Sequence, residues 1–179
     1  MASKSLEDLV PEAKKNAGKV IEVCNQVGFD LLIYCTLRSP EEQAKLYRQS
    51  RSWAEIKDKI LALKDRGFGF IADILDAVGP CTGPHVTNAG PGESWHNYGE
   101  AWDAVPMVNG KPAWNYLNAK SEWDAYGECV RQVGMQWAGD WTTFREYPHA
   151  QLRQGGNPLK QYKPDEIRAM LSKRGLLVK

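Results

Sequence analysis

Residues 94–103 read SWHNYGEAWD and form the most informative stretch of the 179-residue chain. They place His96 seven residues before Asp103. At that spacing one helix holds the two side chains about 10 Å apart along its axis, and one strand puts them on opposite faces. The two side chains can therefore meet only across a turn. Asn97 and Gly99 tolerate the positive φ that such a turn needs, so we predict a reversal there, with Asp103 on the strand that follows.

Asp103 lies in an apolar run, residues 101–105 (AWDAV), that we expect to be a buried strand. Burying an unpaired carboxylate costs several kcal/mol, and a bound cation removes that cost. Downstream, residues 146–149 read EYPH, and Pro148 argues for a bend that turns Glu146 and His149 into one cleft. Two imidazoles and a carboxylate can hold a catalytic zinc, and a further carboxylate supplies its base. Taken alone, either segment is also compatible with ordinary polar surface.

The remaining sequence alternates helical and extended patterns. Apolar residues recur at threes and fours over residues 6–27, which predicts a helix that begins near Pro11 and ends at Gly28. Further helices are expected after Ser39, as two short helices within 53–78, over 122–133 and over 164–173. The expected strands cover 29–36, 101–108 and 144–152. Asn109-Gly110 predicts a type I′ turn. These elements predict an α+β fold, a single domain over residues 1–179 with a small central antiparallel sheet flanked by helices.

The composition is that of a globular protein, with 42% hydrophobic and 25% charged residues. Lys plus Arg (23) and Asp plus Glu (22) balance to a net charge of +1, and no stretch concentrates basic residues, so we expect no nucleic-acid partner. The longest apolar stretch, residues 29–35, is far shorter than the roughly 20 residues that span a bilayer, so we expect no stable membrane association. The first residues contain no apolar run of signal-peptide length, so we expect synthesis in the cytoplasm.

The four cysteines and seven tryptophans have a simple expected role in packing. The cysteines are widely spaced and form no CxxC pair, so we expect buried, reduced thiols, with a disulfide or catalytic role as the alternative. Most of the tryptophans are expected to pack around the metal loops, and Trp95 is the best candidate to face a cleft.

The motif Ser94-x-His96-x-x-Gly99-x-Ala101-x-Asp103, followed by Glu146-x-x-His149, resembles the zinc D-alanyl-D-alanine and L-alanyl-D-glutamate peptidase family. This family, M15, includes VanY-like and VanX-like peptidases and many phage endolysins. Neighbouring blocks resemble its endolysin-type branch: Thr36-x-Arg38-Ser39, Glu42-Gln43-x-x-x-Tyr47, residues 86–92 and Gly139-Asp140-Trp141-x-x-Phe144. The resemblance covers most of residues 29–152, with the catalytic motifs within 36–152, and implies the hedgehog/DD-peptidase-like fold.

The resemblance implies a role for each residue of the motif. His96, Asp103 and His149 would bind Zn²⁺, and Glu146 would be the general base. Arg38 would neutralise charge on the tetrahedral intermediate, and Ser94 would line the substrate site. The alternative for Arg38 is an ordinary surface arginine.

The same resemblance implies a zinc metallopeptidase that hydrolyses the peptidoglycan stem peptide. An L-alanyl-D-glutamate endopeptidase is expected first. A D-alanyl-D-alanine carboxypeptidase or dipeptidase and a catalytically inactive metal-bearing binding domain are the alternatives. We expect a monomer that acts on the cell wall after lysis-type release, with a bacterial housekeeping role as the alternative.

Two positions and one segment depart from the family pattern. Endolysin-type members often have Asp where this chain has Glu146, and usually an aromatic residue where it has Ala150. Glu is equivalent to Asp as a base but is one methylene longer. Residues 53–81 also look longer than in compact phage members, so we expect a helical insertion there. His85, near the end of this segment, is expected to face solvent, with a role beside the metal as the alternative.

Overall fold

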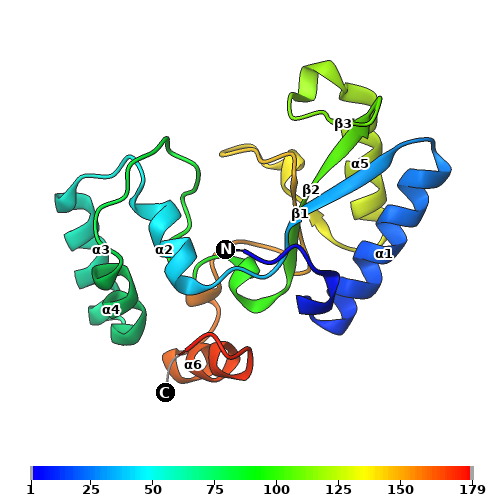
Figure 1. Cartoon of the computed structure of the whole chain (residues 1–179). Coiled ribbons are helices and arrows are strands. Elements are labelled where there is room, and N and C mark those ends of the chain that lie inside the picture. The colour runs from blue at the N-terminus through cyan, green and yellow to red at the C-terminus, as the bar shows by residue number, and fades with distance from the viewer. Residues whose placement is uncertain (1, 178–179) are drawn as a thin grey trace. The chain divides into compact units, whose positions relative to one another are not determined.

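The computed structural model describes residues 2–177, and their contacts group them into two compact units. The sheet unit comprises residues 2–37 and 99–155, and the helical unit comprises residues 38–98 and 156–177 (Figure 1). The chain therefore passes between the units three times, and each unit is built from segments that are far apart in sequence.

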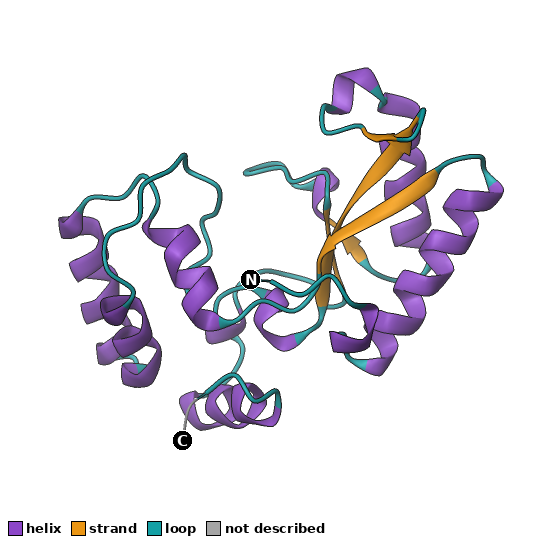
Figure 2. Cartoon of the chain, viewed as in Figure 1, coloured by secondary structure: helices purple, strands orange, loops and turns teal. Residues whose placement is uncertain are grey.

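The sheet unit contains a five-stranded antiparallel sheet, shown in orange in Figure 2. Its strands are β1 (Asp30–Cys35), β2 (Ala101–Val108), β3 (Lys111–Pro112), β4 (Gln136–Trp137) and β5 (His149–Gln151). The order is β1-β2-β5-β4, and β3 also pairs with β2. In the register of this sheet, Asp103 on β2 lies opposite Cys35 on one side and His149 on the other.

Two helices of the sheet unit, α1 (Pro11–Gln26) and α5 (Lys120–Gln132), contact one another and the sheet (Figure 1). They bury an apolar core to which β2 contributes Trp102 and Ala104. Because side chains alternate along a strand, Asp103 between them faces away from this core. Short 3₁₀ turns complete the unit: η1 (Leu6–Asp8), η3 (Tyr116–Asn118) and η4 (Ala138–Asp140).

The helical unit contains α2 (Pro40–Arg48), α3 (Trp53–Asp65), α4 (Gly69–Ala77) and α6 (Pro164–Lys173), with the 3₁₀ turns η2 (Trp95–Tyr98) and η5 (Pro158–Lys160). Ser39 caps α2 by accepting a hydrogen bond from the Glu42 amide, and Ser52 forms a capping box with Glu55 at the start of α3. Residues 53–81, where a helical insertion is expected, contain α3 and α4, which pack against each other.

The predicted α+β class is confirmed, and the differences lie in the short elements. The extended piece expected over 144–152 contains only three strand residues, and the two residues of β4 were not predicted, because so short a strand shows no periodicity. The predicted turn is present: Asn109 and Gly110 have φ of 51° and 73° and join β2 to β3. Among residues 2–177, no helix is both long and apolar enough to cross a bilayer.

Candidate metal centre

Two of the predicted ligands meet in the sheet unit. Asp103 and His149 face each other across β2 and β5, and Oδ1 of Asp103 lies 3.1 Å from Nδ1 of His149. Both side chains are largely buried. Zinc bonds to nitrogen and oxygen of about 2.0–2.1 Å in a tetrahedral site put two donors about 3.3 Å apart, so this pair fits one zinc ion.

The strand carrying His149 is held by its backbone. The carbonyl oxygen of Pro148 accepts hydrogen bonds from the Ala104 amide, at 3.1 Å, and from the Tyr126 hydroxyl, at 3.0 Å. The His149 ring also lies against Trp141, with 5.7 Å between the ring centroids. The position of the imidazole is therefore set by both the sheet and an aromatic neighbour.

Glu146 lies three residues before His149, on the other side of Pro148. The His149 amide donates to the Glu146 carbonyl at 3.2 Å, and the Glu146 side chain is half-buried. Burial alone would lower the pKa of His149. The hydrogen bond and charge of Asp103, with smaller contributions from Glu146 and Gln151, outweigh it and raise that pKa above its ordinary value. The imidazole thus sits in a negative environment that favours a bound cation.

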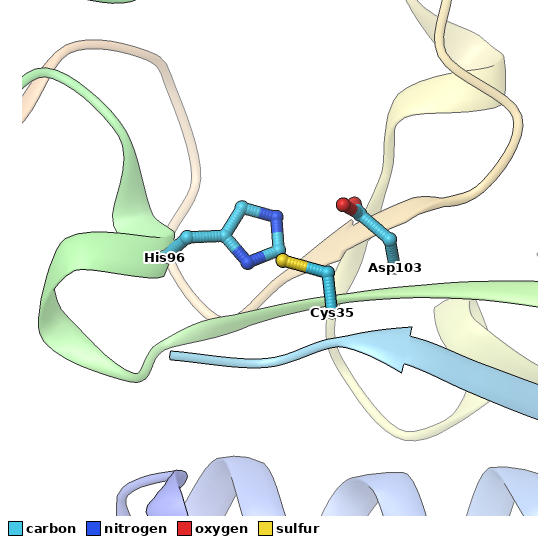
Figure 3. A group of neighbouring side chains, drawn as sticks. All are labelled: Cys35, His96 and Asp103. Atoms are coloured by element: carbon cyan, nitrogen blue, oxygen red, sulfur yellow. The ribbon is translucent and has the colours of Figure 1, made fainter. Parts of the chain in front are cut away.

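Cys35 is a neighbour of Asp103 that the sequence did not single out. It ends β1 opposite Asp103, and its Sγ lies within 4.8 Å of a carboxylate oxygen of that residue. Figure 3 shows the two side chains pointing to the same side of the sheet. It also labels His96, which belongs to the helical unit. Cys35 and Asp103 are 68 residues apart in sequence, so their proximity can be recognised only from the register of β1 against β2.

The helical unit brings together the other three predicted residues, Arg38, Ser94 and His96. The Arg38 amide donates to the His96 carbonyl at 3.1 Å, and Asn97 Nδ2 donates to the Arg38 carbonyl at 2.8 Å. Ser94 is half-buried, and its Oγ accepts from the His96 amide at 3.4 Å. The His96 side chain is buried.

The Arg38 guanidinium is held in place by a glutamine. Its Nη1 donates to Gln43 Oε1 at 2.8 Å, and Gln43 Nε2 donates in turn to the Ala89 carbonyl at 2.7 Å. A surface arginine without fixed neighbours would have no such support. The arrangement favours a positioned cation at Arg38.

Glu93 anchors the loop that leads to Ser94. Its buried carboxylate accepts from Lys59 Nζ at 2.6 Å, from the Gly90 amide at 2.8 Å and from Asn157 Nδ2 at 2.7 Å. The loop is also closed by the Tyr98 hydroxyl, which donates to the Gly92 carbonyl. Glu93 was not predicted from the sequence. The signal that could have indicated it is an acidic residue directly after the glycine-proline-glycine run of residues 90–92.

Two further expectations have clear outcomes. His85 is exposed, as predicted, and its ring nitrogens contact Ser50 and Asn88. The expectation that Trp95 faces a cleft is wrong, because its side chain is 2% exposed and packs edge-on against Tyr98 and Tyr162. Trp95 therefore belongs to the packing of the helical unit, as Trp102, Trp123 and Trp137 belong to that of the sheet unit, whereas Trp53 and Trp114 are exposed.

Comparisons with known proteins show the family to which the chain belongs. Residues 87–152 match the family model Peptidase M15_4, described as D-alanyl-D-alanine carboxypeptidase. The chain is 31% identical over 151 residues to the peptidoglycan L-alanyl-D-glutamate endopeptidase CwlK of Bacillus subtilis, an alignment that covers 81% of this chain and 74% of CwlK. The chain belongs to the M15 peptidase family. The family match spans Ser94, His96, Asp103, Glu146 and His149.

Two solved structures of peptidases are also similar to the chain. The L-Ala D-Glu endopeptidase ChiX of Serratia marcescens aligns with a TM-score of 0.43 and 19% identity over 86% of this chain and 89% of ChiX. A variant of the D,D-pentapeptidase VanY from the VanB-type resistance cassette, solved in complex with Zn(II), aligns with a TM-score of 0.44 and 14% identity over 92% of this chain and 78% of VanY.

Proposed function

We propose that this M15 family member is a zinc-dependent L-alanyl-D-glutamate endopeptidase that cuts the peptidoglycan stem peptide. The observation that carries the proposal is the buried Asp103–His149 pair, with its donor atoms 3.1 Å apart and Glu146 beside it. The likeness to CwlK favours the L-alanyl-D-glutamate bond.

The proposed zinc ligands are His96, Asp103 and His149. One carboxylate and two neutral imidazoles leave a zinc site with a net positive charge and one position for a fourth ligand. When bound, zinc in such a site supplies Lewis-acid polarisation of the scissile carbonyl and lowers the pKa of a water molecule. The domain proposed to carry these residues spans 1–179, with the catalytic motifs within 36–152.

Glu146 is the proposed general base. Its half-buried carboxylate would take a proton from the attacking water and pass it to the leaving amine of the cleaved peptide bond. Glu is long enough to serve where other members have Asp, and its neighbour His149 supports its placement near the reaction.

Arg38 and Ser94 are proposed to act on the substrate. The Arg38 guanidinium, held by Gln43, would stabilise negative charge that develops on the carbonyl oxygen. A donor fixed before the reaction costs little reorganisation when the charge appears, so the Gln43 contact supports this role. Ser94, beside the His96 amide, would line the same substrate site.

A D-alanyl-D-alanine carboxypeptidase or dipeptidase is the second candidate, favoured by the description of the family model over residues 87–152. A metal-bearing domain without catalysis is the third, and the presence of Glu146 speaks against it. In all three the partner is the peptidoglycan stem peptide. We further propose that the chain acts as a monomer on the cell wall after lysis-type release, without nucleic acid or stable membrane association.

Product analysis of digested peptidoglycan separates these functions. Purified peptidoglycan is incubated with the protein, with and without a chelator, and the new ends are identified by mass spectrometry. Freed D-Glu amino termini that disappear with the chelator are expected. Released D-Ala would replace the first candidate by the second, and binding without any new ends would leave only the third.

A further inference from the structure

Gln151 contributes a buried amide next to the proposed zinc ligand His149. The residue ends β5 and is 2% exposed. Its Nε2 donates to three oxygens: Gln136 Oε1 at 2.7 Å, the Arg153 carbonyl at 2.7 Å and the Gly155 carbonyl at 3.0 Å. Its Oε1 lies 3.1 Å from Nε2 of His149.

The surroundings of Gln151 fix which end of its amide faces the histidine. Backbone carbonyls can only accept hydrogen bonds, so the amide nitrogen must face Arg153 and Gly155, and the amide oxygen must face His149. The turn that carries these carbonyls is itself anchored, because Arg153 Nε donates to the buried Glu100 carboxylate at 2.6 Å. The Leu152 amide also donates to the Glu100 carbonyl at 2.8 Å.

An amide oxygen accepts and never donates, so the His149 nitrogen facing it must carry a proton. A neutral imidazole has one proton, and with that proton on Nε2 the lone pair is on Nδ1. Nδ1 is the atom that lies 3.1 Å from Asp103 Oδ1. In the neutral, metal-binding form of the imidazole, the hydrogen bond to Gln151 therefore places the lone pair on Nδ1, where a cation would replace the proton that Nδ1 shares with Asp103 in the hydrogen bond described above.

We propose that Gln151 is a positioning residue that selects the tautomer of His149 in which Nδ1 binds the metal. This inference rests on the proposed function, since it takes His149 to be a zinc ligand. A glutamine suits the task because it accepts a hydrogen bond without adding charge. Removal of such a partner from a metal-binding histidine weakens metal affinity about 10–100-fold.

Zinc affinity and nitrogen NMR test this role directly. Zinc dissociation constants are measured by competition with a chromophoric chelator for the wild type, Gln151→Leu and the control Gln136→Ala. The control removes one partner of the Gln151 amide but leaves both backbone carbonyls. Gln151→Leu is expected to raise the dissociation constant about 10–100-fold and Gln136→Ala far less. In zinc-loaded, ¹⁵N-labelled wild type, His149 is expected to carry zinc on Nδ1 and a proton on Nε2.

Each outcome decides the matter. An unchanged zinc dissociation constant in folded Gln151→Leu, or zinc on Nε2 of His149 in the wild type, overturns the role of Gln151 and leaves the proposed peptidase function standing. If Gln151→Leu does not fold, the wild-type spectrum decides alone. Zinc on Nδ1 in a wild type that releases no peptidoglycan fragments upholds Gln151 and overturns the peptidase. A wild type that binds no zinc overturns both.

Discussion

Asp103 combines burial with a hydrogen bond to another ionisable group, the imidazole of His149. Its carboxylate is near His149 on one neighbouring strand and near Cys35 on the other. Replacing a buried polar pair by apolar residues is often neutral or stabilising, so the pair gains little for the fold by itself. The proposed zinc ion would give the carboxylate and the imidazole a shared role.

Glu146→Gln separates chemistry from metal binding. The substitution keeps the size of the side chain but removes its ability to accept a proton, so the rate of peptidoglycan cleavage is expected to fall about 10²–10⁴-fold. Zinc content, measured by elemental analysis, is expected to stay at the wild-type level because Glu146 is not a proposed ligand. Glu128→Gln, on the exposed surface of α5, is the matched control and should cleave at the wild-type rate. Equal rates for Glu146→Gln and the wild type would remove Glu146 as the base.

Tyr126→Phe tests the support beneath His149. The fully buried Tyr126 hydroxyl accepts from Trp102 Nε1 at 3.1 Å and donates to the Pro148 carbonyl. Its loss leaves an indole N–H without this acceptor in the core, so the free energy of unfolding should fall by about 1–3 kcal/mol in urea titrations. The control Tyr116→Phe removes a hydroxyl bonded to the half-exposed Asp124 and should cost less.

The same residue predicts a pH dependence. Burial raises the pKa of Tyr126 well above its ordinary value of 10.0, so above pH 10 the unfolded chain loses a proton that the folded chain keeps. The folded state then binds more protons, and the free energy of unfolding falls as pH rises. The free energy of unfolding of Tyr126→Phe should therefore fall less steeply with pH than that of the wild type. The two slopes should differ by up to about 1.4 kcal/mol per pH unit. Parallel pH profiles above pH 10 would contradict this.

At the residue scale, the sequence predicted candidate metal ligands but not the residues that surround them. The family resemblance named Asp103 and His149, and the structure pairs them. Cys35 and Gln151 had no sequence signal, because their importance depends on strand register and on which nitrogen of an imidazole faces which partner. Register is a property of the folded sheet.

At the scale of elements, local rules predicted the long helices and tertiary packing decided the short strands. Ser39-Pro40 marked the start of α2, and Asn109-Gly110 the β2–β3 turn, because capping and positive φ depend on a few adjacent residues. By contrast, β4 exists through its pairing with β5, and Trp137 on it is fixed by contacts from α5 and η4.

Two helical glycines offer a matched test of this packing. A Cβ at Gly127 on α5 would lie 2.3 Å from the Trp137 ring, whereas a Cβ at Gly18 on α1 would meet nothing within 4 Å. Gly127→Ala is therefore expected to lower the free energy of unfolding by about 1–3 kcal/mol through overpacking. Gly18→Ala is expected to raise it by about 0.5–1 kcal/mol, since alanine is the better helix former. Chemical denaturation of the two variants measures both, and equal shifts of the same sign would contradict the packing described for Trp137.

At the scale of the whole molecule, the motif of residues 94–103 continues from one unit into the other. His96 belongs to the helical unit and Asp103 to the sheet unit, and the crossing falls at Gly99, whose φ of 69° provides the predicted reversal. The sequence predicts this turn because two side chains seven residues apart cannot meet within one straight helix or strand. The division of the chain into two units could not be predicted from the sequence, since it depends on contacts between segments that are far apart in sequence.

Zinc binding should appear as stability of the whole chain. A ligand that binds only the folded state adds RT ln(1 + [L]/Kd), or about 2.7 kcal/mol when free zinc is 100-fold above its Kd. For a chain of this length that corresponds to a rise in Tm of roughly 5–10 °C. His149→Ala should abolish most of this rise, whereas His85→Ala should keep it, because the exposed His85, whose ring nitrogens contact Ser50 and Asn88, is not a proposed zinc ligand. Thermal melts with added zinc or chelator measure the shift, and a full zinc response in His149→Ala would exclude that residue as a ligand.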